Sequence, residues 1–321
     1  MNRLMWIDEL KGIAIILVVI GHLFWLPSEL HQIIYAFHIP IFFFISGFLF
    51  RQDKYLNIAM LLQKNTHRLL KPYFIFSTIS LLLFVTLFRL FEKDASLFDA
   101  IIGIFYSTSS TLHIIHNQPL WFLTCLFVVE LIFWLISSVA KSNYSLIVAS
   151  MIFMTGGFFL NDQYFPLKLP WSIDVALVAA GYYSFGQLAR KKLSFFKGNR
   201  IFGAILLVLL FSIILKFNIV LAMDSKQYSN PAALALPFFI IYAIVCILKD
   251  TRQIKFLCFF GQNTLVILGT HNMIILACRL LFDHLLKLQS NLLMTSLSTV
   301  IVLILSALLI KFIAYSKSSL K

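Results

Sequence analysis

Long apolar runs recur along the whole chain, and they constrain its fold more than any other feature. Each run is close to the ~20 residues that an α-helix needs to cross a hydrocarbon core of ~30 Å. Of the 321 residues, 60% are hydrophobic and 12% are charged, whereas a soluble domain carries about a quarter charged residues. Such a surface is incompatible with water. The sequence therefore predicts an all-α, polytopic transmembrane helical bundle.

The apolar runs also indicate how the chain is divided. The longest polar connections, 51–71 and 92–118, are too short to fold separately in water. We therefore expect a single transmembrane domain over residues 1–321. Counting the runs predicts about ten transmembrane helices. They lie near 10–26, 33–50, 73–91, 119–138, 145–160, 173–189, 201–219, 231–248, 257–281 and 292–314.

The distribution of basic residues predicts the orientation of the bundle. Most of the 26 lysines and arginines fall in alternate connections, on the side that would contain the N-terminus. Positive charge is enriched in cytoplasmic connections, so we expect both termini in the cytoplasm. This topology explains the net charge of +13 better than nucleic-acid binding does. The four cysteines form no CxxC pair, and nothing in the pattern indicates a metal site.

The first apolar run and its flank carry ionisable residues, which are costly in a membrane and by default mark a functional site. Asp8, Lys11 and His22 share one face of a continuous helix, because eleven residues at 100° each return to within about 20° of the starting direction. A neutral imidazole is suited to accept a proton from a hydroxyl. The lysine, near the cytoplasmic surface, is suited to an anion. Alternatively, Asp8 and Lys11 pair at a helix end and His22 only hydrogen-bonds a neighbouring helix.

Two following segments add polar residues. The segment AFHIPIFFFISGFLF, from Ala36, places His38 and Ser46 in the second run. A Ser-Gly pair in a span more often permits close helix packing than catalysis. Arg68 and Lys71 are three residues apart on one predicted helical face, an arrangement suited to phosphate. Alternatively, these two cations lie on anionic lipid headgroups and fix the topology.

Three later residues are candidates for a polar cavity. Trp121 begins the fourth run, where an interfacial aromatic belt also explains it. Asp174 lies at the outer start of the sixth run without a local basic partner, and His271 lies inside the ninth. We expect them, with His38 and Ser46, to line a polar, substrate-binding cavity.

Taken together, these residues resemble the acyltransferase-3 family of bacterial membrane acyltransferases. The family's first-helix pattern, a basic residue followed eleven positions later by histidine, is matched by Lys11 and His22. The resemblance covers nearly the whole chain. It is carried by IDELKGIAIILVVIGH (7–22), FHIPIFFFISGFL (37–49), RLLKPY (68–73) and PLWFL (119–123), and more loosely by PWSIDVALVAAGYYSFGQL (170–188) and GQNTLVILGTHNMII (261–275).

The resemblance implies a multi-pass O-acetyltransferase of the bacterial inner membrane that uses acetyl-CoA and modifies a sugar of a surface polysaccharide or glycolipid. It implies that His22 is the catalytic histidine and Lys11 its basic partner, while Arg68 and Lys71 contribute to the acyl-donor side. We expect Asp8 to orient the basic groups. Family members often carry arginine where this chain has Lys11 and Lys71, and lysine lacks the bidentate geometry of arginine.

Two other classes of function fit parts of the pattern. A transporter or flippase for a glycolipid or another solute also needs polar residues near the middle of the membrane. A non-catalytic membrane partner in an envelope assembly is the second alternative, and in that case His22 should be replaceable without loss of function. The basic cluster beside the first-helix histidine favours the acyltransferase.

Overall fold

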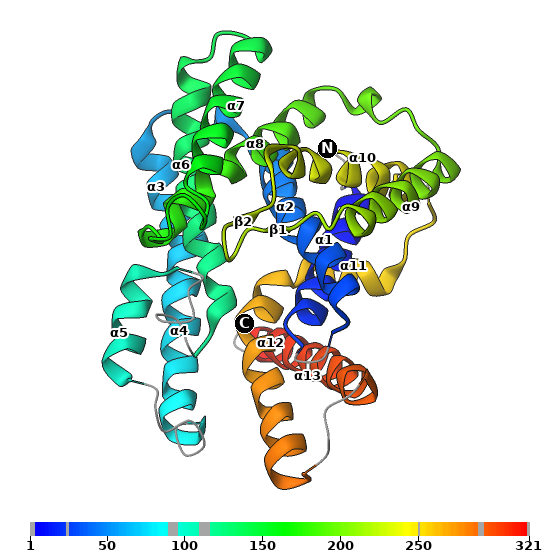
Figure 1. Cartoon of the computed structure of the whole chain (residues 1–321). Helices are drawn as coiled ribbons and strands as arrows, with labels where there is room; N and C mark the ends of the chain where they lie inside the picture. The colour runs from blue at the N-terminus through cyan, green and yellow to red at the C-terminus, as the bar shows by residue number, and fades with distance from the viewer. Residues whose placement is uncertain are drawn as a thin grey trace.

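The computed structural model describes residues 4–23, 26–88, 96–108, 116–249, 251–287 and 292–319, and most of them are helical (Figure 1). A short antiparallel hairpin, β1 (Leu221–Ala222) and β2 (Gln227–Tyr228), lies between two of the helices. The α-helices are α1 (Met5–Gly21), α2 (Ser28–Leu49), α3 (Ile58–Asn65), α4 (Lys71–Leu83), α5 (Leu97–Tyr106), α6 (Trp121–Val139), α7 (Asn143–Phe159), α8 (Ile173–Lys191), α9 (Arg200–Lys216), α10 (Leu236–Leu248), α11 (Lys255–Gln262), α12 (Thr264–Arg279) and α13 (Leu292–Ser319).

Six helical segments of the described residues are long and apolar enough to cross a membrane. The protein is therefore a helical membrane protein, as predicted. Each of the ten predicted runs coincides with helix in the described residues, although residues 24–25 of the first run and 89–91 of the third lie outside them. The number of crossings and the side on which the termini lie stay predictions. The six segments are Ser28–Leu49, Ile58–Thr86, Gln118–Val139, Pro231–Leu248, Thr264–Asp283 and Leu292–Ser316.

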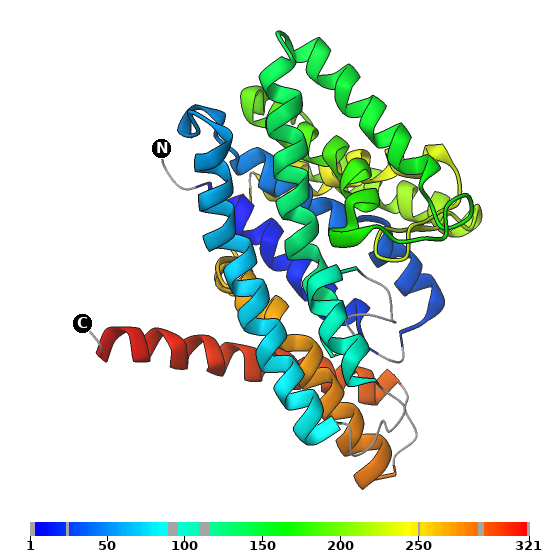
Figure 2. The same cartoon turned by 90° about the vertical axis from the view of Figure 1, so that its left-hand side faces the viewer.

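The segment 51–71, predicted as a polar connection, is helical over much of its length. The helix begins at Ile58, is capped by the Asn57 side chain and continues through α4 as one long rod (Figure 2). A π-helical turn at Thr66–Leu70 comes just before Pro72. In a regular α-helix, the proline ring clashes with the carbonyl four residues earlier, and a wider turn relieves that clash. Pro72 therefore lies within a longer helix and does not mark its start.

Two other predicted segments are divided differently in the structure. Helix α5 forms inside the connection 92–118, with Ser96 capping its first turn. The predicted run 257–281 is broken at Asn263, which separates α11 from α12. The Asn263 side chain donates to the Phe259 carbonyl at 2.8 Å, and such local side-chain bonds compete with helical hydrogen bonding.

The chain reversals gather at two ends of the bundle. At one end, Arg190 of α8 donates to the Phe50 carbonyl just past α2, at 2.9 Å. At the other end, Gln32 near the start of α2 donates to the Ile219 carbonyl just past α9, at 3.0 Å. We call these the basic end and the distal end. The basic end contains connections that the charge bias assigns to the cytoplasm.

Helices α2 and α8 cross at very short range because glycine faces backbone on both sides. A Cβ at Gly47 would lie 1.9 Å from the Tyr183 carbonyl oxygen, and one at Gly186 would lie 1.9 Å from the Phe44 carbonyl oxygen. Helices α1 and α11 meet in the same way. Small residues that allow backbones to approach are typical of helix contacts in membranes.

We expect the Gly186→Ala variant to be less stable by about 1–3 kcal/mol, because its methyl group can fit only if the two helices separate. The measurement is the midpoint of thermal unfolding in detergent. The matched control is Gly156→Ala on α7, where a Cβ would meet nothing within 4 Å. Equal midpoints for the two variants would contradict the close crossing.

Candidate functional site

A cavity of about 240 Å³ lies between helices α1, α2, α6 and α12 and the π-helical turn of the long α3–α4 rod. In Figure 1, α1 runs through the middle of the molecule, between α2 and α12. Most of the cavity wall is apolar and includes Ile15, Val18 and Leu268. A cavity of this kind accommodates a thin, largely apolar ligand.

Polar groups lie at separate levels of this cavity. Lys11 and Arg68 line it, and so do His22 and His38. The eleven residues from Lys11 to His22 correspond to about 16 Å along a helix. His38 lies about 12 Å along α2 from Ser46, which is next to the basic groups. The cavity therefore has cations on the side nearer the basic end and imidazoles on the side nearer the distal end.

A smaller basic pocket of about 80 Å³ adjoins the cation side of the cavity. The two share Ser46, Leu49 and Arg68. Three further cations contribute to the basic pocket, and one of them, Arg51, is paired with Asp53 at 3.0 Å, so that positive charge still outweighs negative charge. These cations are Arg51, Lys54 and Lys64.

The carboxylate of the basic pocket belongs to Glu130, in the middle of α6. It is buried and lies 2.5 Å from the Arg68 guanidinium, which is 44% exposed. Arg68 also donates to the Asn65 side chain at 3.2 Å. These contacts hold the guanidinium in place while part of it stays accessible. Glu130 was not predicted, although it is the only acidic residue in the apolar run 119–138.

Lys71 and Asp8, which were predicted to act together with the cations of the site, have environments that differ from that of Arg68. Lys71 is exposed and is not among the described residues that line the cavity. The reason is the π-helical turn around Arg68, because a wider turn rotates the next residues away from α-helical spacing. Asp8 is buried on α1, and its carboxylate accepts a hydrogen bond of 3.4 Å from Gln262 of α11.

The three histidines of the site share one tautomer. Nδ1 of His22 is 2.8 Å from the Val18 carbonyl, Nδ1 of His38 is 2.7 Å from the Ile34 carbonyl, and Nδ1 of His271 makes the same i−4 contact at 2.8 Å. A carbonyl oxygen only accepts, so in each neutral ring Nδ1 carries the proton and Nε2 carries the lone pair. His22 is half-buried and lines the cavity, so its Nε2 can act as a base on a bound ligand.

The other residues predicted to line the substrate-binding cavity fall into two groups. Ser46 and Trp121 line the cavity, and Trp121 is buried at the start of α6. Ser46 lies on the cation side, where it also lines the basic pocket, and not beside the histidines as expected for a residue that binds an acceptor. His271 is fully buried on α12, and its ring packs edge-on against His22 with centroids 5.2 Å apart. It therefore packs against the His22 ring and helps to hold that ring in place.

Asp174 has a different environment from the one predicted. Its carboxylate lies 3.1 Å from Nζ of Lys226, and both side chains are 1% exposed. Lys226 also donates to the Phe165 and Leu167 carbonyls, at 2.8 Å each. This buried pair ties together two distal loops. Sequence inspection near Asp174 does not reveal the partner, because Lys226 lies in the later loop.

The fold and the site together define a class: a helical membrane protein whose internal cavity is lined by cations toward one end and by histidines toward the other. The family model described as the acyltransferase domain matches residues 4–311 of the chain. The chain therefore belongs to the acyltransferase-3 family and is a membrane acyltransferase. Searches among curated proteins and among solved structures found no match.

Proposed function

We propose that the protein is an O-acetyltransferase that moves an acetyl group from acetyl-CoA to a sugar hydroxyl of a surface polysaccharide or glycolipid. One observation carries this proposal: a single cavity has Lys11 and Arg68 toward one end and His22 toward the other. Acetyl-CoA has matching chemistry, because its charged phosphates and its thioester lie at opposite ends of a thin pantetheine arm.

The donor enters from the basic end. Its phosphates bind in the basic pocket, where Arg51, Lys54, Lys64 and Arg68 supply charge-assisted hydrogen bonds. The pantetheine arm then follows the apolar wall toward His22. Partial neutralisation of Arg68 by Glu130 weakens its attraction for phosphate but fixes its position. Lys71, exposed three residues after Arg68, adds to the positive potential of the basic end.

At the histidine, the acceptor hydroxyl oxygen attacks the thioester carbon. Nε2 of His22 takes the hydroxyl proton, the new C–O bond forms, and the C–S bond breaks. The departing thiolate then takes the proton from His22, which leaves CoA with a free thiol and restores the neutral imidazole. In a second route, Nε2 attacks the thioester first and the hydroxyl then cleaves the acyl-histidine.

The proposed donor path also sets the orientation of the protein. Acetyl-CoA is a cytoplasmic metabolite, so the basic end faces the cytoplasm, in agreement with the charge bias. Ten crossings then place both termini on that side. The family's bacterial members suggest the inner membrane as the location.

The test is a transfer assay with the protein reconstituted in lipid. Radiolabelled acetyl-CoA is added with a polysaccharide or lipid-linked sugar fraction from the organism that encodes the protein. We expect label in the glycan and one free CoA for each acetyl transferred. Movement of a glycolipid across the bilayer without CoA release would instead support a transporter.

A further inference from the structure

A group of aromatic and polar side chains surrounds the distal end of α1, next to His22. The Tyr35 hydroxyl donates to the carbonyl of Gly21 at 3.2 Å, one residue before the histidine. The Tyr35 ring packs edge-on against His38, with centroids 4.9 Å apart. Tyr35 therefore lies immediately behind the part of the cavity wall that His22 and His38 form.

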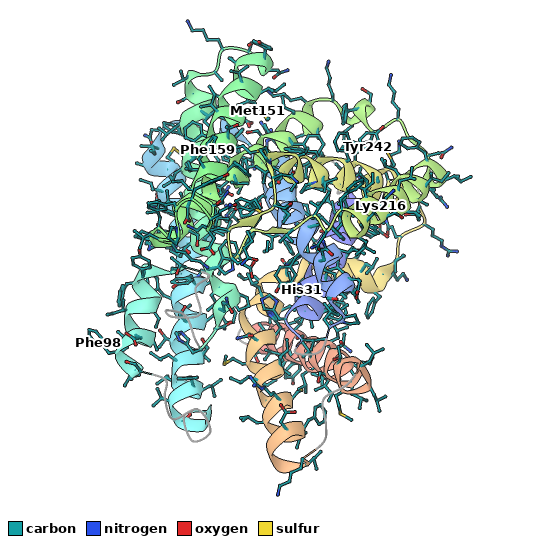
Figure 3. All side chains as sticks on the ribbon, viewed as in Figure 1. His31, Phe98, Met151, Phe159, Lys216 and Tyr242 are labelled. Atoms are coloured by element: carbon teal, nitrogen blue, oxygen red, sulfur yellow. The ribbon has the colours of Figure 1, made fainter. Side chains whose placement is uncertain are left out.

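On the side away from His38, Tyr35 contacts a residue at the protein surface. His31, one helical turn earlier on α2, stacks on it with ring centroids 3.8 Å apart and an interplanar angle of 22°. His31 is exposed, and Figure 3 shows it near the middle of the molecule, beside the ribbons of α1 and α2. The packed rings of His38, Tyr35 and His31 thus connect the cavity wall to solvent, where His31 presents an exposed aromatic surface.

A carboxylate lies close to this aromatic surface. Asp224 sits in the turn of the β1–β2 hairpin, which packs against α2, and is near enough to act electrostatically on His22, His31 and Tyr35. Lys168, from the other distal loop, donates to the Asp224 carbonyl at 3.3 Å. Partial burial lowers the pKa of Lys168, and the Asp224 carboxylate opposes that shift.

This combination has the chemistry of a carbohydrate site. The C–H face of a pyranose ring is apolar and packs on an aromatic ring, while its hydroxyls donate to a carboxylate. The site also has the right position. A donor that fills the cavity from the basic end closes that approach to His22, so an acceptor must come from the distal end.

We infer that His31, Tyr35 and Asp224 form an acceptor subsite that holds the pyranose ring of a glycan with one hydroxyl directed at His22. This inference rests on the proposed function and specifies where its second substrate binds. The exposed ring of His31 provides the stacking surface, Tyr35 supports that ring by stacking on it, and Asp224 accepts from the sugar hydroxyls. None of these three residues lines the basic pocket that is proposed to bind the phosphates of the donor.

The test is a steady-state comparison in the transfer assay, with the polysaccharide or lipid-linked sugar fraction as the varied acceptor, expressed in sugar equivalents. We expect Asp224→Asn and His31→Ala each to raise the apparent KM for this acceptor about ten-fold, while the KM for acetyl-CoA stays unchanged. Tyr35→Phe retains the stacking ring and should change the acceptor KM much less than Tyr35→Leu.

The matched control is Asp162→Asn, which removes an exposed carboxylate from a distal loop. If the acceptor KM of Asp224→Asn and His31→Ala equals that of this control, the subsite is wrong and the transferase stands. An equal rise in both KM values would indicate a structural disturbance and would also overturn the subsite. Absence of transfer by the wild type would overturn both the subsite and the function.

Discussion

The His22→Ala variant is expected to transfer acetyl groups about 10²- to 10⁴-fold more slowly than the wild type, which is the usual contribution of a positioned general base. The reason is that His22 places an Nε2 lone pair in the cavity, with its tautomer fixed by the Val18 carbonyl. The quantity to measure is kcat for label transfer from acetyl-CoA to the glycan. An acyl-histidine route predicts a loss at least as large.

This variant should still fold, so the loss can be assigned to chemistry. The ring of His22 is half-buried, makes one backbone contact and packs against His271. A matched control is His67→Ala, which removes an exposed histidine from the long α3–α4 rod. A wild-type rate in His22→Ala would remove the base from the mechanism and favour a non-catalytic role.

The second large effect is on stability. Replacing Lys226 with methionine should destabilise the protein by about 3–5 kcal/mol, because the Asp174 carboxylate would remain buried without its cation. The loss would also release the Phe165 and Leu167 carbonyls, to which the ammonium donates. The measurement is chemical or thermal unfolding in detergent.

Two controls make this stability prediction specific. Lys216→Met removes an exposed lysine at the end of α9 and should change the free energy of unfolding by less than about 0.5 kcal/mol. The double variant Lys226→Met with Asp174→Leu should recover part of the loss, because it removes both charges but leaves the backbone groups that the two side chains bonded without these partners. Equal destabilisation by the single and double variants would show that the ion pair is not the cause.

The sequence is most informative where the physics is local. The helical wheel puts Lys11 and His22 on one face of the first helix, and both line the same cavity because α1 is continuous from Met5 to Gly21. The apolar runs predict helices throughout the chain, and the membrane class is confirmed. The catalytic and binding roles of these residues stay predictions.

The sequence is least informative where pairing is non-local or where a helix departs from regular spacing. Glu130 meets Arg68, and Asp174 meets Lys226, only because distant helices and loops pack together. The π-helical turn at Thr66–Leu70 changes the direction of Lys71, which α-helical spacing places beside Arg68. Such a turn leaves no clear periodic signal in five residues.

The most direct measurement uses a cysteine inside the donor path. Ser46 lines both the cavity and the basic pocket, and the four native cysteines are buried. In the Ser46→Cys variant, the rate of reaction with a small water-soluble thiol reagent is measured with and without CoA. The control variant, Ser194→Cys, carries an exposed cysteine outside the cavity.

We predict that CoA slows the labelling of Ser46→Cys by about ten-fold or more and leaves the labelling rate of Ser194→Cys unchanged. We also predict that the labelled Ser46→Cys protein no longer transfers acetyl groups. Equal labelling rates with and without saturating CoA, together with full transfer activity after labelling, would show that the donor does not occupy this cavity.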